Sequence, residues 1–372
     1  MLVQVEAAVS YEKSEPFQIK QLTMKGIGPN DVLVKIVGVG LCHTDVAARD
    51  EQMPVQKPCV LGHEGSGIVE SVGANVTKVV PGDHVVLTVA FCGECRPCIS
   101  GHPAYCDQLV PLNFSDGRSG EAGTFYDGDK EIHGHFFGQS SFANYAIAHH
   151  SNVIKVRKDA PLELLGVLGC GVQTGAITVM NALKATPGSS IVVFGVGPVG
   201  LSGILAARVS SCTKIIAVDV LDARLQMAKE LGATDVINVS NLSSVEAIAE
   251  QILSIVPGGV NYAFDTTGRL ENLKAGINAM ATLGKLAFVG VPHSDKPLEV
   301  DLFPMMLKGH SIMGVVQGDT VPEVHIPMMV DLYMSGLFPF DRMIAKYKFN
   351  QINEAIEDQK NGKVVKVVFT FD

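Results

Sequence analysis

The 372-residue sequence has no long apolar run, no cluster of basic residues and no internal repeat. Its apolar stretches are shorter than the roughly 20 residues that a membrane-spanning helix needs. The formal net charge is −9 and no local run of lysine and arginine offsets it, which argues against binding to nucleic acids or anionic membranes. The first residues show no basic segment followed by an apolar one, so no secretory signal is predicted. We therefore expect a cytoplasmic protein without nucleic-acid or membrane partners.

The length and the pattern of apolar and glycine residues predict an α/β protein of two domains. The hydrophobic content of 47% is that of a globular chain, and 372 residues exceed one ordinary core. Up to about residue 165, glycine-punctuated β-rich runs such as 31–37 and 83–89 indicate an antiparallel, barrel-like domain. From about Cys170, strands alternate with helices, which is typical of a doubly wound parallel sheet. The final run, 363–371, is expected to return to the first domain, and residues 113–139 are expected to form a long surface loop near the site.

Four cysteines within fifteen positions predict a metal-binding lobe. Cys92, Cys95, Cys98 and Cys106 form a C-x2-C-x2-C-x7-C pattern. Four thiolates suit a closed tetrahedral structural zinc site, with an iron–sulfur centre as the alternative. A disulfide scaffold does not fit so long a chain.

A second donor set is scattered along the sequence: Cys42, His63 and Cys170. Two thiolates and one imidazole leave the fourth position of a zinc ion open for a substrate oxygen, as a catalytic zinc requires. The two remaining cysteines, Cys59 and Cys212, lie in apolar segments and are interpreted as core residues.

A glycine-rich turn predicts a dinucleotide site. Gly195, Gly197 and Gly200 form a G-x-G-x-x-G pattern between the apolar strand 190–194 and an apolar helix. Such glycines let the backbone approach a pyrophosphate at the helix N-terminus. Asp219 ends the next strand, nineteen residues after Gly200, where a carboxylate accepts hydrogen bonds from the adenosine ribose. Because this carboxylate repels a 2′-phosphate and Val220, Leu221 and Asp222 after it offer no cation, NAD is favoured over NADP.

Together these motifs resemble the zinc-dependent medium-chain alcohol dehydrogenases over essentially the whole chain. Besides the two cysteine patterns and the glycine fingerprint, the resemblance rests on Gly62-His63-Glu64 and the glycines that follow. Within this family, the stretches around Asn113, His135 and Leu165 are most similar to the aryl (benzyl) alcohol dehydrogenases. The resemblance implies a GroES-like catalytic domain over 1–170 with its zinc lobe at about 92–106, a Rossmann NAD-binding domain over 171–316, and a return to the catalytic domain over 317–372.

The resemblance also implies roles for single residues. Thr44 would accept the proton of the alcohol, Asp45 would orient a zinc ligand, and Glu64 would be able to approach the metal. Taken alone, Asp45 is better interpreted as a helix cap or turn residue. His43 and Lys366 are expected at the cofactor's pyrophosphate and Thr174 beside its nicotinamide. Relatives often carry a proton-relaying histidine where this chain has Ala47, so the exit of the proton stays open.

The predicted activity is the reversible oxidation of a small primary alcohol to its aldehyde, with two zinc ions per chain and NAD. The resemblance favours benzylic or allylic alcohols, in a pocket lined by residues such as Thr88, Val89, Phe91 and Phe114, which as core residues would fit the sequence equally well. S-hydroxymethyl thiol conjugates and simple aliphatic alcohols are alternatives, and a crystallin-like structural protein is the non-enzyme alternative. A homodimer or homotetramer is expected, paired through an apolar strand such as 284–291.

Overall fold

The computed structural model describes residues 3–115, 125–242, 244–291 and 297–371. They form two units, each with its own hydrophobic core. Unit 1 comprises Met1–Gly171, Val321–Ser335 and Asp341–Asp372, and unit 2 comprises Val172–Thr320 and Gly336–Phe340.

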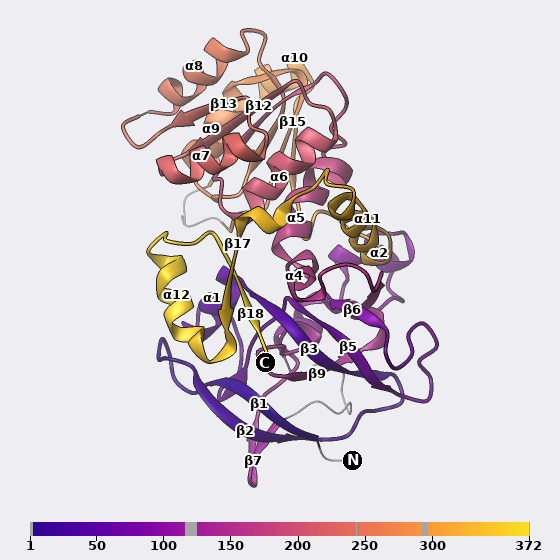
Figure 1. Cartoon of the computed structure of the whole chain (residues 1–372). Coiled ribbons are helices and arrows are strands. Elements are labelled where there is room, and N and C mark those ends of the chain that lie inside the picture. Colours follow the sequence, from indigo (N-terminus) through magenta and orange to yellow (C-terminus); the bar gives the residue numbers. More distant parts are fainter. Residues whose placement is uncertain (1–2, 116–124, 243, 292–296, 372) are drawn as a thin grey trace. The chain divides into compact units, whose positions relative to one another are not determined.

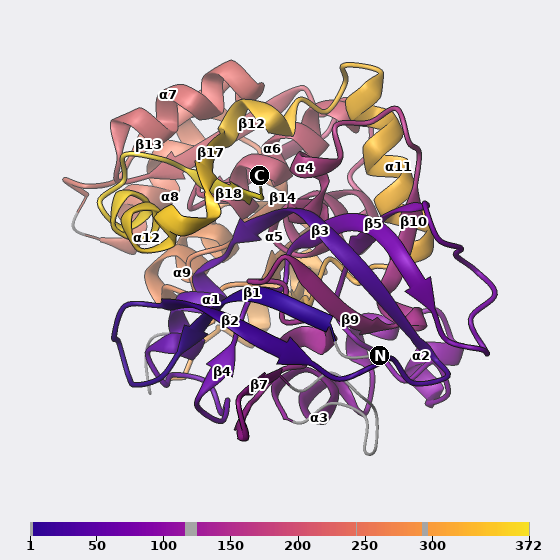
Figure 2. The same cartoon turned by 60° about the horizontal axis from the view of Figure 1, so that its bottom comes forward.

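Unit 1 is built on two sheets whose strands are nearly all antiparallel. The first has the order β4-β1-β2-β7-β8, with β1 (Val3–Ser10), β2 (Gln18–Met24), β4 (Cys59–Val60), β7 (Phe125–Asp127) and β8 (Lys130–Ile132). The second has the order β10-β6-β5-β3-β18-β17, with β3 (Asp31–Leu41), β5 (Gly65–Val72), β6 (His84–Leu87), β10 (Val153–Val156), β17 (Ile344–Lys348) and β18 (Lys366–Thr370). Strand β9 (Tyr145–His149) also pairs with β3. Figure 2 shows the long strands β3 and β5 beside the β1–β2 hairpin.

Strand β3 is the centre of unit 1. It pairs with β5, β9 and β18, and most of its side chains are buried because neighbouring strands cover it. Its pairing with β18 brings the C-terminal strand against residues 38–41, as the indigo and yellow ribbons of Figure 1 show. The helices of this unit are α1 (His43–Arg49), α2 (Arg96–Ile99), α3 (Leu109–Phe114), α4 (Leu162–Leu165), α11 (Pro322–Met334) and α12 (Ile352–Lys360).

Unit 2 contains one parallel six-stranded sheet. Its strands are β11 (Ser190–Phe194), β12 (Lys214–Asp219), β13 (Asp235–Asn238), β14 (Val260–Asp265), β15 (Met280–Phe288) and β16 (Ser311–Gly314). Their order, β13-β12-β11-β14-β15-β16, is the doubly wound order 3-2-1-4-5-6. All five residues of β11 are buried because this strand is central and has helices on both faces. The expected parallel sheet is confirmed.

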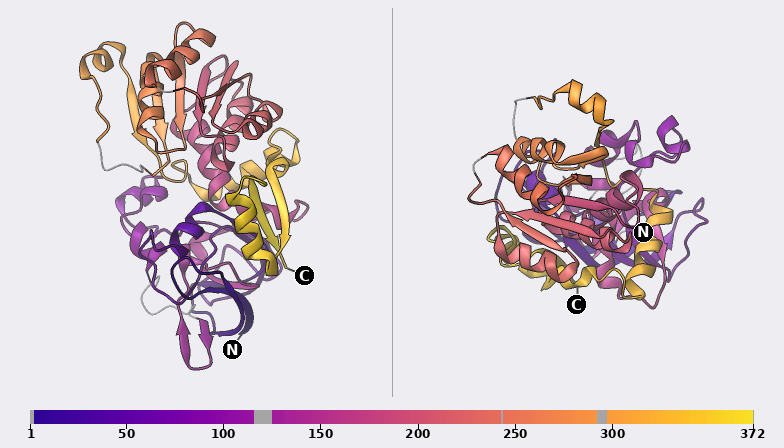
Figure 3. Two further views of the ribbon diagram at one scale, coloured as in Figure 1. Left: turned by 90° about the vertical axis from the view of Figure 1, so that its left-hand side faces the viewer. Right: turned by 90° about the horizontal axis from the view of Figure 1, so that it is seen from above.

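The helices of unit 2 are α5 (Gly171–Ile177), α6 (Pro198–Val209), α7 (Asp222–Leu231), α8 (Val245–Ile255), α9 (Leu270–Asn278) and α10 (Leu302–Lys308). Right-handed crossovers from β11 outward place α6 and α7 on one face of the sheet. The reversal after β13 places α8 and α9 on the other face, and each pair is in mutual contact. Figure 3 shows helices on both sides of the strands.

One sequence-based expectation was wrong. The segment 113–139, expected to be a long surface loop, contains the end of α3, the β7–β8 hairpin and a turn of 3-10 helix over Phe136–Gly138, although 116–124 lie outside the described residues. Phe125, Ile132 and Phe136 are buried in the core of unit 1, which the polar composition of the segment concealed. Cys59 and Cys212 are buried, as expected.

Among the described residues, no single helix is long and apolar enough to cross a membrane. Two consecutive short segments, Leu162–Gly169 and Gly171–Ala182, reach the required length and composition only when they are taken together across a break.

Candidate active site

The catalytic donor set assembles in unit 1 at the ends of three segments. Cys42 follows β3 and precedes α1, His63 lies between β4 and β5, and Cys170 follows a 3-10 turn that ends at Gly169. The ligand atoms of Cys42, His63, Glu64 and Cys170 all lie within 4.8 Å of one another. Residues up to 128 positions apart in sequence, from 42 to 170, thus converge on one point.

The His63 ring is held in an orientation that suits a metal ligand. Its Nδ1 lies 2.8 Å from Oδ1 of Asp45, and both side chains are fully buried. Among the described residues, its Nε2 is buried without a hydrogen-bond partner. A buried orphan nitrogen beside two sulfurs fits a zinc ion, and the Asp45 contact directs Nε2 toward it. Burial works against a charged imidazole, but the Asp45 carboxylate raises the pKa of His63 well above its ordinary value.

Asp45 serves two functions at once. Its Oδ2 accepts from the Cys42 backbone N–H (2.9 Å), which caps α1, and its Oδ1 also accepts from the Gly62 N–H (3.1 Å). One carboxylate therefore both caps α1 and contacts the His63 ring, and it ties the Cys42 segment to the His63 segment.

The sulfur of Cys42 is the readily ionised donor. Its hydrogen bond with Cys170 lowers the pKa of Cys42 well below the ordinary value although burial opposes this, and His63 adds to the effect. Zinc binds the thiolate form, so the site favours the metal. The Thr44 hydroxyl oxygen lies 3.6 Å from the Cys42 sulfur, beside the donor set.

Glu64 and Lys366 form a buried ion pair next to these donors. The Lys366 Nζ lies 2.5 Å from Glu64 Oε2 and donates to the Leu41 carbonyl (2.9 Å), while Glu64 Oε1 accepts from the Gly171 N–H (3.2 Å). Burial raises the pKa of Glu64, and Lys366 opposes that rise. Lys366 is only 1% exposed, so its ammonium serves Glu64 and Leu41 in this structure, and contact with the pyrophosphate stays a prediction.

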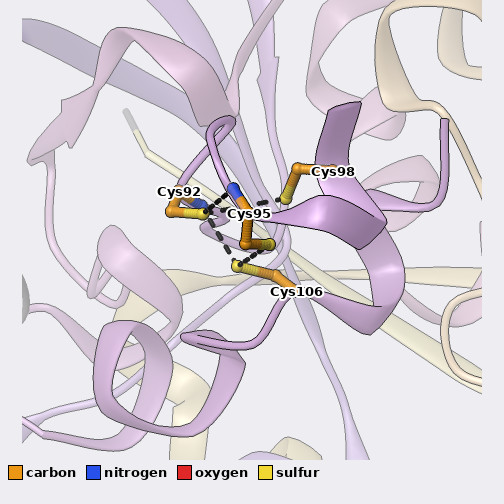
Figure 4. Close-up of side chains that lie close together, drawn as sticks. All are labelled: Cys92, Cys95, Cys98 and Cys106. Atoms are coloured by element: carbon orange, nitrogen blue, oxygen red, sulfur yellow. Dashed lines mark hydrogen bonds between the residues drawn. The ribbon is translucent and has the colours of Figure 1, made fainter. Parts of the chain in front are cut away.

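The four cysteines of the lobe form a second compact donor set (Figure 4). The sulfurs of Cys92 and Cys98 are 3.9 Å apart, as are those of Cys95 and Cys106, and all four lie within 4.8 Å of one another. Backbone N–H groups point at the sulfurs, as from Asp107 to Cys95 and from Gln108 to Cys106. Although burial opposes it, such donors lower the pKa of Cys92 to about 7. Four cysteine sulfurs within 4.8 Å of one another fit a closed structural zinc.

The glycine fingerprint lies in unit 2, between β11 and α6. Gly195 has a φ of +80°, and a Cβ there would lie 2.6 Å from the Thr266 hydroxyl. A Cβ on Gly200 would lie 1.9 Å from the Gly195 carbonyl oxygen, so this glycine lets helix and strand pack closely. A Cβ on Gly197, the residue preceding α6, would meet no atom of the described residues within 4 Å. This open cradle at a helix N-terminus fits a pyrophosphate.

Asp219 lies at the end of β12 and is 8% exposed. Its Oδ2 accepts from the Val196 N–H of the fingerprint (2.8 Å), and its Oδ1 accepts from Val220 and Leu221. These bonds hold the carboxylate at the fingerprint. The other expected cofactor residues lie in both units: His43 is exposed on α1 of unit 1, and Thr174 is half-buried on α5 of unit 2.

An aromatic group beside His63 was not predicted from the sequence. The ring of Phe137 stacks on the imidazole, with centroids 4.4 Å apart and planes at 22°, and Phe136 meets it edge-on at 5.5 Å. Phe114, a predicted pocket residue, contacts Phe137 at 5.1 Å. Thr88 and Val89 are buried, and Phe91 is half-buried. The adjacent phenylalanines in a glycine- and serine-rich stretch were the available signal.

Comparison with known proteins decides the family. Residues 28–158 match the alcohol dehydrogenase GroES-like domain, and residues 198–333 match the zinc-binding dehydrogenase domain. The chain belongs to the zinc-binding alcohol dehydrogenases. Zinc and a nicotinamide dinucleotide are therefore the cofactors of this dehydrogenase, its substrate is a small molecule, and the crystallin-like alternative is set aside.

Similar proteins cover the whole dehydrogenase. Geraniol dehydrogenase of Castellaniella defragrans is 39% identical over 99% of this chain and 98% of its own. Benzyl alcohol dehydrogenase of Acinetobacter calcoaceticus is 45% identical, with a TM-score of 0.92 and full coverage of both chains. An alcohol dehydrogenase zinc-binding domain protein from Burkholderia ambifaria is 44% identical, with a TM-score of 0.96 and full coverage of both chains.

Replacing Cys98 with serine will lower the zinc content of the purified enzyme from two ions per chain to one, because three thiolates do not close a tetrahedral site. Metal analysis measures this directly. The control is Cys212→Ser, since Cys212 is a buried cysteine outside both donor sets. Retention of two ions by the Cys98 variant would show that the lobe does not hold zinc.

Proposed function

We propose that this dehydrogenase oxidises primary benzylic or allylic alcohols to aldehydes with NAD, reversibly. The observation that carries the proposal is the convergence of the ligand atoms of Cys42, His63 and Cys170 within 4.8 Å, with a His63 Nε2 that is buried and has no hydrogen-bond partner among the described residues. In this assignment, residues 1–170 and 317–372 make the catalytic domain and 171–316 the NAD-binding domain.

The site residues of unit 1 have different roles in the proposed reaction. Cys42, His63 and Cys170 hold the zinc, and Asp45 sets the tautomer and orientation of His63. Bound there, zinc supplies a Lewis acid that makes an alcohol easier to deprotonate, and NAD accepts the hydride. Thr44 would be the first relay group, since its hydroxyl lies beside the Cys42 sulfur: it would accept the proton of the alcohol while releasing its own proton toward solvent. Ala47 is buried and offers no side-chain acceptor, so the proton leaves by another route.

The aromatic group supports the substrate class. Phe114, Phe136 and Phe137 contact one another next to His63, with ring centroids 4.9 to 6.3 Å apart. An aromatic environment favours a flat, unsaturated substrate through edge and face contacts. The relatives named above as acting on geraniol and benzyl alcohol, one allylic and one benzylic, agree with this choice.

Steady-state kinetics on benzyl alcohol, geraniol, ethanol and S-hydroxymethylglutathione will test the substrate class. We expect kcat/KM for benzyl alcohol and geraniol to exceed that for ethanol by at least about 100-fold, because each apolar group bound in a pocket contributes roughly 10–200-fold. A preference for ethanol or for the thiol conjugate would refute the proposal and support the corresponding alternative.

We assign NAD as the preferred cofactor because of Asp219. Its carboxylate is held at the fingerprint by the Val196, Val220 and Leu221 N–H groups. It can accept a hydrogen bond from a ribose hydroxyl and repels a 2′-phosphate.

Asp219→Asn will lower the ratio of kcat/KM for NAD to that for NADP by about tenfold or more, since a hydrogen bond to a charged group contributes roughly 1.5–3 kcal/mol. The matched control is Asp222→Asn, a nearby acid that accepts from Asn238 and does not contact the fingerprint. An unchanged ratio in the Asp219 variant would remove Asp219 from cofactor selection.

We also propose that the enzyme is a homodimer or a dimer of dimers. Strand β15, the strand expected at the interface, is paired on both edges with β14 and β16 and cannot bind another strand. On this side of the sheet, the edge strand is β16. Nearby, helix α10 exposes Leu302, Phe303, Met306 and Leu307 to between 65 and 72%. Exposed apolar side chains beside a free sheet edge support self-association.

Light scattering will measure the oligomer. Wild type is expected at two or four times the chain mass, and the double variant Phe303→Glu, Leu307→Glu at half the wild-type mass, because four introduced carboxylates would meet in one two-fold interface. Val80→Glu, an exposed apolar position in unit 1, serves as the control. A monomeric wild type would overturn the proposal.

A cytoplasmic location is the final part of this proposal. All eight cysteines are free thiols in the structure, and six of them make up the two zinc donor sets. A reducing compartment keeps such thiols available to the metal.

A further inference from the structure

Residues 135–142, called here the backing segment, lie along the chain that carries His63. The Ser141 and Phe142 N–H groups donate to the carbonyls of Gly62 and Leu61, both at 2.9 Å. The Ser140 hydroxyl donates to the Val60 carbonyl at 2.7 Å. A Cβ on Gly62 would lie only 2.3 Å from the Phe142 nitrogen, so the backing segment and the His63 segment are in direct contact. The backing segment therefore acts as a template for residues 60–65.

The backbone of the backing segment is strained where it meets the imidazole. Phe137 has a φ of +51°, and His135 and Ser140, also not glycines, have φ values of +66° and +48°. Such conformations persist only where the surroundings over-determine them, and they gather at functional sites. Here the strained turn places the Phe137 ring flat against His63.

Ring stacking supplies a restraint that Asp45 does not. The Asp45 carboxylate holds the Nδ1 edge of the imidazole at 2.8 Å. A bond at one edge leaves the ring free to tilt about that contact. The Phe137 face, 4.4 Å away and within 22° of parallel, blocks the tilt on that side, and the edge of Phe136 adds a second contact.

Gln139 links the segments that carry two of the zinc donors. Its side chain is 1% exposed; Oε1 accepts from the Gly65 N–H (3.2 Å), and Nε2 donates to the His63 carbonyl (3.0 Å) and to the Thr88 carbonyl (3.4 Å). The Thr88 hydroxyl in turn donates to the carbonyl of Gly169, the residue before Cys170. One buried amide thus connects the His63 segment, through Thr88, to the Cys170 segment.

We propose that Phe137 and Gln139 are positioning residues of the catalytic zinc site: the ring of Phe137 fixes the tilt of His63, and the amide of Gln139 fixes the distance between the His63 and Cys170 segments. Both act through the ligands and neither donates to the metal. The proposal rests on the zinc of the proposed function and is independent of which alcohol is oxidised.

The experiment measures the rate at which the intact enzyme releases zinc to a chromogenic chelator. The lobe zinc and the catalytic zinc appear as two kinetic phases when they leave at different rates. Phe137→Leu keeps an apolar side chain and removes the ring face, and Gln139→Leu keeps the volume and removes the three hydrogen bonds. Each is expected to speed the release of one zinc by about 10–100-fold, the usual effect of losing a group that orients a ligand, and to leave the lobe zinc unchanged. Phe137→Tyr, which keeps the ring, restores slow release.

Two controls separate positioning from general destabilisation. Phe349→Leu alters a buried ring of unit 1 that packs on Phe369 and Phe371 rather than on His63. Asn113→Leu removes a buried amide of the same kind, which binds Ala90 beside the lobe. Neither is expected to change the release of the catalytic zinc. In the cobalt-substituted enzyme, the visible spectrum of the catalytic site shifts in the Phe137 and Gln139 variants and not in the controls.

Equal release rates in wild type and in both folded variants would overturn the proposal, as would equal acceleration of both zinc ions. If Phe137→Leu or Gln139→Leu does not fold, Phe137→Met and Gln139→Glu are measured in their place with the same expectation. A wild-type enzyme whose only zinc is lost on Cys98→Ser would instead contradict the proposed function itself, because the catalytic donors would then hold none.

Discussion

The buried carboxylate of Asp45 is the group on which the geometry of the zinc site depends. It accepts hydrogen bonds from Cys42 N, Gly62 N and His63 Nδ1, so one charge joins two of the three ligand segments. A buried carboxylate is tolerated only when it is paired and hydrogen-bonded, and here every contact also serves the site. Helix capping, imidazole orientation and loop closure are thus one interaction.

Other buried polar side chains connect the Cys170 segment to the Cys42 and His63 segments. Lys366 binds the carbonyl before Cys42 and the carboxylate after His63, and that carboxylate reaches the N–H after Cys170. The amide of Gln139 adds a neutral link along a different route. Three donors that are distant in the sequence therefore share a network of buried polar contacts that holds them in fixed positions.

In unit 2, the predicted dinucleotide site is built from residues that are close together in the sequence. The turn from β11 into α6 needs glycine at three places for three reasons: a left-handed φ at Gly195, an open approach at Gly197 and close packing at Gly200. Asp219 then accepts from the Val196 N–H of the same turn, so the residue proposed to select the cofactor also holds the loop expected to bind it. These features lie close together in the sequence, so they could be predicted without a structure.

By itself, the sequence determined both donor sets, the fingerprint with Asp219 and the parallel sheet, because metal spacing, glycine turns and apolar strands are local patterns. Only the tertiary structure decided the partners of Lys366, the ring contacts of Phe136 and Phe137 on His63, and the edge position of β16. Each of these depends on which distant segments become neighbours: 137 with 63, 366 with 64, and 285–288 with 311–314. Pairing across such separations is set by packing of the whole unit, which no window of the sequence contains.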